Sequence, residues 1–345
     1  MTSPSTKDAW PLARRTTSRL RCPPLEARWC LPADSFGEVR IRWCCHRASG
    51  FLLPSTAQPG NERRAARQLA CLSVPSTQPK LLVVGGGKMG EALVGGLLAA
   101  GWARPGEILV IEPSDVRRAE LDTALPGVPV AERIQTGHRA DGALVAVKPQ
   151  HVADVCRAVA PLVDRVLSIA AGITIGSIEA ALREGAPDRA IPVVRSMPNT
   201  PALVGLGASA IAGGTSATEA DLAWAASILG AVGLVERVDE KLLDAVTGLS
   251  GSGPAYVFLM AEALIDAGVL MGLPRSTAAA LAAQTIRGAG ELLVGSPEDP
   301  ARLRANVTSP GGTTAAGLRA LESGGMRAAV IDAVVAATRR SAELG

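Results

Sequence analysis

Aromatic residues are scarce in this chain of 345 residues, with Phe, Trp and Tyr making up 3% of it. Because hydrophobic residues still amount to 48%, the core must be built from Ala, Val, Leu and Ile. Histidine is also rare, and His46, His138 and His151 lack the spacing of metal ligands, so we expect no bound metal. No run of about 18 apolar residues is free of charge, which predicts a soluble protein with no membrane partner.

Cysteine is nearly confined to the N-terminal part of the chain. Residues 1–78 contain five of the six cysteines, and none of these has the paired CxxC spacing typical of zinc sites. They are Cys22, Cys30, Cys44, Cys45 and Cys71. Cys156 stands alone in residues 79–345, which fits a reducing compartment. We therefore expect a cytoplasmic protein.

The same N-terminal segment holds an excess of basic residues. Residues 1–78 carry 12 Lys and Arg against 5 acidic residues, whereas residues 79–345 carry 23 against 27. The segment has no helical or strand period, so it is predicted to be disordered. Its arginines also resemble those of a transit peptide, and a start codon assigned upstream of the true one is a third interpretation. The acidic balance of residues 79–345 gives no reason to expect a nucleic-acid partner.

The first motif follows a short apolar strand at Leu81–Val84. Gly85-Gly-Gly-Lys-Met-Gly90 has the G-x-G-x-x-G spacing and leads into an amphipathic helix. Gly85 permits the turn, Gly87 lets the backbone approach a pyrophosphate, and Gly90 lets helix and strand pack closely. The sequence therefore predicts a dinucleotide site. The cofactor contacts expected here are Gly85, Gly87, Lys88, Met89 and Gly90.

The second strand, 107–111, bears on the choice between NADH and NADPH. It ends at Glu112, about twenty residues after the glycine loop, where a carboxylate normally accepts hydrogen bonds from a ribose 2′-OH. Such a carboxylate favours NADH. Pro113 follows, however, and can turn the Glu112 side chain aside.

Several polar and basic residues follow this strand. Ser114, Arg117 and Arg118 come directly after Pro113, and Arg133 adds a further cation. A 2′-phosphate is bound best by such a cluster, because charge-assisted hydrogen bonds are about twice as strong as neutral ones. We therefore favour NADPH and leave NADH open.

Further strands and helices alternate through the first half of the chain. Strand-like runs at 143–147, 165–170 and 192–194 are separated by helix-like segments at 152–162 and 175–184. This alternation predicts an α/β fold with a Rossmann-type, doubly wound parallel sheet. We assign this domain to residues 79–240.

Ligands of such a sheet bind at the carboxyl ends of its strands. The loops expected there are Val147-Lys148-Pro149, 170–172 and 196–201. They are predicted to line a nicotinamide crevice.

Residues 241–345 form a second, all-helical domain. Before it, a helix is expected at 219–231 and a short strand at 233–238. The helices expected from there on are 240–247, 254–271, 275–295, 298–306, 313–323 and 325–343. The helix over 254–271 carries only Glu262 and Asp266 as charges, so it is apolar nearly all round. Such a helix must be buried on more than one face, which favours packing against a second chain.

Two more glycine-rich stretches lie in this helical part. Thr247–Pro254 is predicted to be a tight loop feeding a helix, with Ser252 as N-cap and free N–H groups behind it for an anionic group. The Thr247 hydroxyl would face the same space. In Val307–Thr314, the N–H groups of Gly311, Gly312 and Thr313 form a nest suited to a carboxylate.

These motifs together resemble those of pyrroline-5-carboxylate reductases. The similarity covers residues 80–343 and includes Val147-Lys-Pro, Met197-Pro-Asn-Thr-Pro, Asp244–Tyr256 and Thr308-Ser-Pro-Gly-Gly-Thr-Thr-Ala-Ala-Gly-Leu. It implies a Rossmann domain followed by a helical dimerisation domain, with dimers that often assemble further.

The resemblance also implies an activity and site residues. The enzyme would reduce 1-pyrroline-5-carboxylate to L-proline, the last step of proline biosynthesis, by hydride transfer from NAD(P)H. Thr247 would contact the ring and hydrogen-bond or protonate its nitrogen, while the loop at Ser309–Thr314 of the partner chain would hold the carboxylate. Val147, Lys148 and Ala171 would line the cofactor. The substrate-binding residues are then Asn199, Ser252, Gly253, Ser309, Gly311, Gly312 and Thr313, and the cofactor-binding set adds Pro149.

Two departures and two alternatives remain. Lys88 stands where the family usually has Asn, Ser or Gln, and Met326 replaces an aromatic residue. A β-hydroxyacid dehydrogenase needs a lysine on a helix of the second domain, yet Lys241, the only lysine after Lys148, precedes the Thr247 stretch. A non-catalytic dinucleotide sensor would leave both later glycine-rich stretches without a ligand. NAD(P)H oxidation on addition of pyrroline-5-carboxylate separates these hypotheses.

Deletion of residues 1–78 is expected to leave solubility and activity unchanged, because the first predicted strand begins after them. The measurement compares expression and steady-state kinetics of the full and shortened chains. Loss of soluble, active protein on deletion would contradict the domain assignment.

Overall fold

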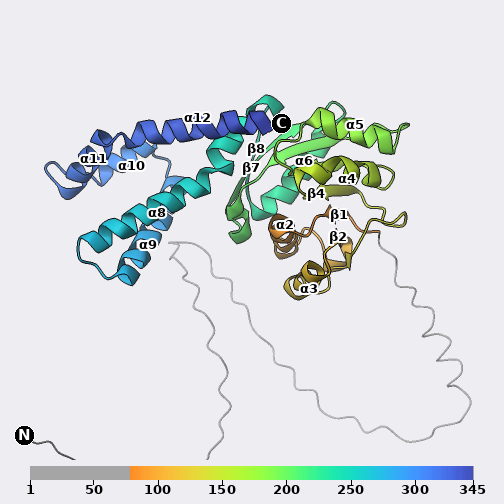
Figure 1. Cartoon of the computed structure of the whole chain (residues 1–345), viewed down its shortest axis with the longest axis horizontal. Coiled ribbons are helices and arrows are strands. Elements are labelled where there is room, and N and C mark those ends of the chain that lie inside the picture. Colours follow the sequence, from red (N-terminus) through yellow and green to blue (C-terminus); the bar gives the residue numbers. More distant parts are fainter. Residues whose placement is uncertain (1–77, 345) are drawn as a thin grey trace, which may run out of the picture. The chain divides into compact units, whose positions relative to one another are not determined.

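The computed structural model describes residues 78–344. Within them, eight strands form one sheet in the order β3-β2-β1-β4-β5-β6-β7-β8. Figure 1 labels β1, β2, β4, β7 and β8 of this sheet. The strands are β1 (Leu81–Val84), β2 (Ile108–Ile111), β3 (Val130–Ala131), β4 (Gly142–Val145), β5 (Val166–Ser168), β6 (Val193–Met197), β7 (Gly207–Gly213) and β8 (Gly233–Arg237). Strands β1 to β6 pair in parallel, and the predicted Rossmann-type fold is confirmed.

Helices cover both faces of this sheet, because its central strands are apolar on both sides. In β1, Leu81 and Val83 pack into one core with α2 (Lys88–Ala99), α3 (Asp115–Ala124) and α6 (Glu219–Leu229). The alternate residues Leu82 and Val84 pack into a second core with α4 (Val152–Val159) and α5 (Ile175–Gly185). Alternation of side chains along the strand thus builds two aliphatic cores.

The sheet differs from the predicted one at β3 and β7, which the sequence pattern missed. Strand β7 also pairs antiparallel with β6, so the sheet is not wholly parallel. The connection between them, residues 198–206, contains the 3₁₀ segment η4 (Thr200–Val204) and then Gly205, which has a φ of +74°. Because a parallel pair needs a crossover of a dozen or more residues, this short connection enforces the antiparallel pairing.

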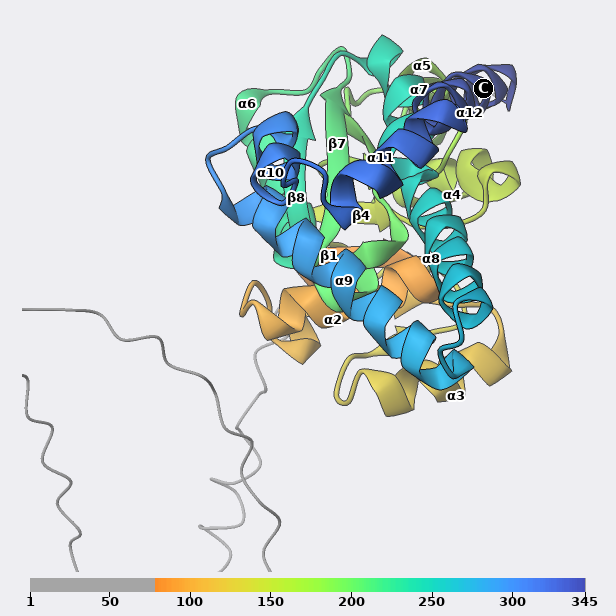
Figure 2. The same ribbon diagram turned by 90° about the vertical axis from the view of Figure 1, so that its left-hand side faces the viewer.

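The helical part begins with a continuous run of helical turns. It consists of η6 (Glu240–Leu242), α7 (Leu243–Val246), the π-helical turn η7 (Thr247–Gly251) and α8 (Gly253–Leu270). The chain continues through α9 (Arg275–Gly295), α10 (Pro300–Asn306), α11 (Thr313–Ser323) and α12 (Met326–Leu344). The last helix, α12, packs beside α7 at the start of the helical part (Figure 2). There Ser341 Oγ donates a hydrogen bond to Asp244 Oδ1 at 2.7 Å.

Helix α8 exposes most of its apolar side chains. It has no buried residue, and Phe258, Leu259 and Leu270 are 64%, 68% and 79% exposed. Apolar residues of α9 and α12, among them Leu292 and Ile331, are exposed as well. Since apolar patches of this extent mark interaction sites, the helical part is built to pack against another protein surface.

The same helix also has the composition of a membrane span. The continuous helical stretch Glu240–Leu270 is long and apolar enough to cross a membrane, judged by its length and composition alone. Glu262 and Asp266 interrupt this stretch, so it contains no uncharged apolar run of about 18 residues. A helix that is apolar on several faces and packs on a second chain has the same length and composition.

The substitution Leu259→Glu is expected to weaken self-association, because a carboxylate would have to be buried at the interface. Light scattering should show dimers or larger assemblies for the unmodified chain and smaller species for the variant. Val116→Glu is the matched control, since Val116 is also 68% exposed but lies on α3. Equal masses for the Leu259→Glu and unmodified proteins would show that α8 is not the association surface.

Candidate active site

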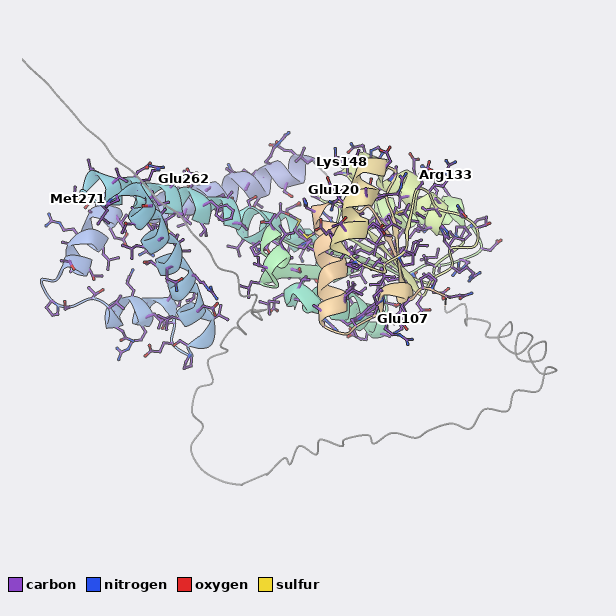
Figure 3. All side chains as sticks on the ribbon, turned by 90° about the horizontal axis from the view of Figure 1, so that it is seen from below. Glu107, Glu120, Arg133, Lys148, Glu262 and Met271 are labelled. Atoms are coloured by element: carbon purple, nitrogen blue, oxygen red, sulfur yellow. The ribbon has the colours of Figure 1, made fainter. Side chains whose placement is uncertain are left out.

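A cleft of 570 Å³ lies at the carboxyl ends of β1, β2 and β4. It is lined by Val84, Gly85, Gly87, Ile111, Glu112, Pro113, Glu132, Arg133, Ile134, Ala146, Val147, Lys148, His151, Asp154 and Val155. Figure 3 shows Arg133 and Lys148 on the sheet-containing part of the chain, whereas Glu262 and Met271 lie out along α8. The position is that of a dinucleotide site in an open parallel sheet.

The glycine loop forms one wall of this cleft. Gly85 has a φ of +106°, and a Cβ there would overlap the carbonyl of Ala146. A Cβ on Gly90 would overlap the Gly85 carbonyl oxygen, so α2 approaches the loop as closely as it does only because Gly90 lacks a side chain. Gly87 faces open space and begins α2 without a side-chain cap, so the first N–H groups of the helix remain available to an anion.

The other predicted cofactor residues divide into two groups. Glu112, Val147 and Lys148 line the cleft. Lys88 and Met89 lie in the first turn of α2, where Lys88 Nζ is 3.5 Å from Glu91 Oε2. Pro149 begins the 3₁₀ segment η3 (Pro149–His151), and Ala171 is exposed after β5.

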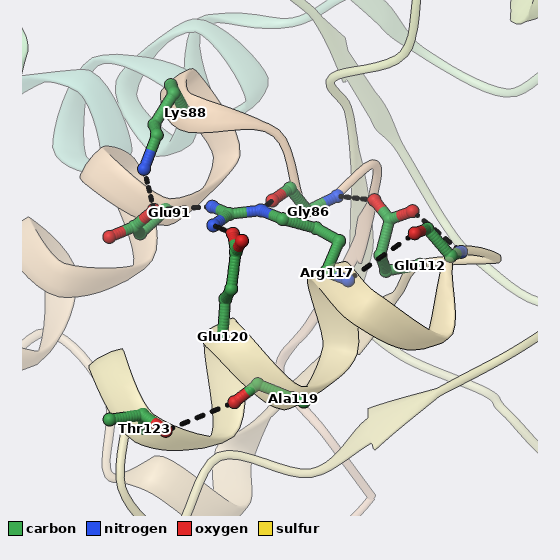
Figure 4. Close-up of polar contacts among 9 residues, drawn as sticks. Gly86, Lys88, Glu91, Glu112, Arg117, Ala119, Glu120 and Thr123 are labelled. Atoms are coloured by element: carbon green, nitrogen blue, oxygen red, sulfur yellow. Dashed lines mark hydrogen bonds and ion pairs between the residues drawn. The ribbon is translucent and has the colours of Figure 1, made fainter.

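The carboxylate of Glu112 supports the backbone around the loop. Its Oε2 accepts a hydrogen bond from Gly86 N and its Oε1 accepts one from Ser114 N, both at 3.0 Å (Figure 4). Each carboxylate oxygen is therefore engaged by the chain itself. This arrangement weakens the argument that Glu112 is free to select a ribose 2′-OH.

Arg117 is engaged at all three guanidinium nitrogens (Figure 4). Its Nε donates to Gly86 O at 2.7 Å, its Nη1 pairs with Glu120 at 2.6 Å, and its Nη2 pairs with Glu91. The hydrogen bond from Arg117 lowers the pKa of Glu91, and the same bond raises the pKa of Arg117. The side chain is 16% exposed, so Arg117 ties α3 to α2 and the glycine loop and does not project into solvent.

Arg118 and Ser114 also bind the chain. Arg118 Nη1 donates to the carbonyl oxygens of Glu112 at 3.0 Å and Pro113 at 2.6 Å. Ser114 is the N-cap of α3, accepting from Arg117 N at 3.4 Å. The basic cluster that the sequence places after β2 is thus largely committed to structure.

Several cleft residues were not singled out from the sequence. Ile134 and Val155 supply apolar wall, while His151 and Asp154 supply polar groups. Ile134 lies shortly after β3, whose two residues are too few for a recognisable strand period. Ile134 could have been found only by recognising β3, because the position of Ile134 in the cleft follows from that strand.

The stretch at Thr247–Gly251 is a π-helical turn, so the prediction of a tight loop there was wrong. Ser252 N donates to Thr247 O at 2.8 Å, the spacing of a π-helix. Ser252 occupies the N-cap position of α8, as predicted, but it has helical φ and ψ and its side chain makes no cap hydrogen bond. Ser252 and Gly253 continue one helix and do not start a new one with free N–H groups.

Side chains from two other places satisfy carbonyls of the π-turn. Tyr256 Oη donates to Gly248 O at 3.1 Å, and Asn199 Nδ2 donates to Ser250 O at 3.0 Å. The Asn199 Oδ1 accepts from Ala208 N at 2.8 Å, and the residue is 8% exposed. Asn199 therefore links the π-turn to the sheet, and its amide is occupied by backbone.

Thr247 is half-buried at the start of this turn. Its Oγ1 donates to Leu243 O at 2.8 Å, four residues earlier in the helix. The hydroxyl proton is therefore directed at the chain, and the oxygen lone pairs remain for another donor.

The third glycine-rich stretch connects α10 to α11, at the end of the helical part remote from the sheet (Figure 1). Gly311 has a φ of +70°, and Gly312 is the uncapped N-cap of α11, whose first residue is Thr313. Gly312 N donates to Ser309 O at 3.0 Å, so the prediction that this N–H is free was wrong. The first-turn N–H groups of α11 still lack a side-chain cap.

Comparison with known proteins places both parts of the chain. Residues 240–344 match the family described as pyrroline-5-carboxylate reductase dimerisation, and residues 80–172 match the one described as NADP oxidoreductase, coenzyme F420-dependent. The pyrroline-5-carboxylate reductase of Synechocystis sp. is 47% identical over 268 residues, which are 77% of this chain and 98% of that protein. The Arabidopsis thaliana enzyme is 42% identical over 279 residues, 79% and 98% of the two chains.

Solved structures agree with these matches. The pyrroline-5-carboxylate reductase of Coxiella burnetii has a TM-score of 0.72 at 36% identity, covering 78% of this chain and 99% of that one. Pyrroline carboxylate reductase of Plasmodium falciparum, solved with NADP bound, has a TM-score of 0.67 at 32% identity, covering 77% and 98%. The chain belongs to the pyrroline-5-carboxylate reductase family.

Proposed function

We propose that the protein reduces 1-pyrroline-5-carboxylate to L-proline with a hydride from NAD(P)H, preferably NADPH. The observation that carries this proposal is the pairing of two features in one chain. A dinucleotide cleft lies at the carboxyl ends of β1, β2 and β4, and a half-buried hydroxyl, Thr247, lies on a π-turn tied to the same sheet through Asn199.

The cleft residues fit a dinucleotide. Open space at Gly87 and the uncapped start of α2 suit a pyrophosphate, and apolar Val147 and Ile134 suit flat rings. When bound, the nicotinamide ring supplies the hydride. The chain's own residues then have to orient the substrate ring and deal with its nitrogen.

Thr247 is the residue we assign to the substrate nitrogen. Because its proton points to Leu243 O, the hydroxyl oxygen is set to accept a hydrogen bond from a protonated ring nitrogen. Rotation of the hydroxyl would also let it donate to a neutral nitrogen. In both cases the contact orients the ring for hydride attack at the imine carbon, the ring carbon that is double-bonded to the nitrogen.

We assign the substrate carboxylate to the loop at Ser309–Thr313 of a second chain. The uncapped first turn of α11 offers N–H groups to an anion, and the exposed faces of α8, α9 and α12 supply the surface for that second chain. The homo-oligomer is then a dimer, and we extend the proposal to dimers that assemble further. Ser252 and Gly253 would contact the substrate only as part of the helix they continue.

The compartment we propose is the cytoplasm. Cys156 is fully buried, and burial raises the pKa of its thiol to about 12, so it behaves as a core residue. It is the single cysteine among residues 78–344, and its thiol is free. A core without disulfides in that range supports a reducing environment.

The proposal predicts that kcat/KM is higher with NADPH than with NADH, with pyrroline-5-carboxylate as substrate. Arginine side chains near the cleft give a 2′-phosphate charge-assisted partners that a 2′-OH cannot use fully. Steady-state kinetics with both cofactors measures this directly. A higher value for NADH would overturn the preference while leaving the reaction intact.

Thr247→Ala is expected to lower kcat by about 10- to 1000-fold, the range for loss of one positioned acid-base group, with little change in NADPH affinity. Thr247→Ser should restore most of the activity. Ser250→Ala is the matched control, because the Ser250 hydroxyl also donates to a carbonyl four residues earlier, at 3.2 Å. A Thr247→Ala enzyme as active as Ser250→Ala would remove Thr247 from the mechanism.

A further inference from the structure

We propose that Arg133, rather than Arg117, is the guanidinium that recognises the adenosine 2′-phosphate of NADPH. The proposal rests on the function proposed above and names the residue that sets the cofactor preference. It follows from how differently the arginines around the cleft are engaged.

Each guanidinium nitrogen of Arg117 already donates to the protein. Its three guanidinium nitrogens bind Gly86 O, Glu91 and Glu120, and its side chain is 16% exposed. Two carboxylates already balance its charge, so a phosphate brought close to it would also meet Glu91 and Glu120. Arg117 is a positioning residue, because it fixes the Gly86 carbonyl and thereby the glycine loop.

Arg118 is partly engaged. One of its terminal nitrogens donates to the carbonyl oxygens of both Glu112 and Pro113. These bonds hold the guanidinium against the strand end. Arg118 is half-buried and is not among the residues that line the cleft, so we assign it a contribution to the positive potential there and not the bidentate contact.

Arg133 is the arginine that lines the cleft. It follows β3, the strand next to β2, so it lies at the same edge as Glu112 and Pro113. Its side chain is 73% exposed, and the one ion pair it makes among residues 78–344 is with the adjacent Glu132, at 2.7 Å. A solvent-exposed ion pair contributes little free energy, so a phosphate can replace Glu132 as the partner of Arg133.

A guanidinium recognises a phosphate more specifically than a hydroxyl or an ammonium group does. A free guanidinium can give two parallel N–H bonds to phosphate oxygens, which is the geometry that distinguishes a 2′-phosphate from a 2′-OH. Each oxygen of Glu112 already accepts one hydrogen bond, from Gly86 N and from Ser114 N, which halves the acceptor sites that this carboxylate has for a 2′-OH. Arg133 therefore decides between the two cofactors.

The first test is kinetic. Arg133→Ala is expected to lower kcat/KM for NADPH by about 10- to 100-fold, the effect of a charge-assisted bond, and to leave the NADH value within about twofold. The kcat/KM of Arg133→Lys for NADPH should lie between those of the unmodified protein and Arg133→Ala, because lysine keeps the charge but cannot form two parallel hydrogen bonds. Arg139→Ala is the matched control, since Arg139 is also exposed but lines a different cavity.

Two further variants separate specificity from loop positioning. Arg117→Ala should raise the KM for NADPH and NADH by the same factor, because a displaced glycine loop affects both cofactors. Glu132→Gln frees Arg133 and should lower the KM for NADPH alone. An unchanged NADPH-to-NADH ratio in Arg133→Ala, or a larger change of that ratio in Arg117→Ala, would overturn the proposal.

A binding measurement keeps this inference apart from the proposed reaction. Calorimetry with adenosine 2′,5′-bisphosphate and with 5′-AMP needs no turnover, so it works even if pyrroline-5-carboxylate is not the substrate. We expect Arg133→Ala to lose about 10- to 100-fold in affinity for the bisphosphate and nothing for 5′-AMP. Equal losses for both probes, or none, would refute the role of Arg133.

Discussion

The exposed apolar surface of the helical part is the constraint on which the rest of the molecule depends. Helix α8 has no buried residue, and Leu259 and Leu270 are more than half exposed. Full burial of one such side chain contributes roughly 1.5–3 kcal/mol, so a second chain supplies stabilisation that this chain does not find in itself. Membership of a family with a dimerisation domain over residues 240–344 identifies that second chain as another copy. The site that we propose, with the loop before α11 as one part, would then be completed across the interface.

The π-turn connects this interface to the sheet. A π-helical turn shifts the hydrogen-bonding register, and such turns occur often at functional sites. Here the Gly248 carbonyl accepts from Tyr256 and the Ser250 carbonyl from Asn199, while a Cβ on Gly248 would overlap Thr338 of α12. Thr247 is thus fixed by contacts from the sheet and from the last helix. A change in either would move the hydroxyl that we assign to the substrate nitrogen.

The sequence predicted features that depend on local residues and missed those that depend on distant partners. The glycine loop and the strands β1 and β2 follow from short patterns, and the helices over 275–295 and 313–323 were predicted with correct bounds. The π-turn was taken for a loop because its Gly, Ser and Pro content is typical of loops, whereas Asn199, 51 residues away from Ser250, stabilises it as helix. Strand β7 consists of Gly, Ala and Ser with a single Ile, and Gly and Ala are depleted in strands. The engagement of Arg117 depends on Glu91, 26 residues earlier.

The most direct test of a site shared between two chains is complementation of two inactive variants. Thr247→Ala removes the hydroxyl, and Gly312→Val disrupts the α11 loop because a Cβ there would overlap Ser309 Oγ. If the two groups come from different chains, each mixed dimer regains one intact site, and random mixing should restore about a quarter of the unmodified activity. If both groups come from one chain, the mixture should be no more active than the separate variants. NAD(P)H oxidation by the co-expressed and the separately purified variants is the measurement, and activity that never exceeds the separate variants would contradict a shared site.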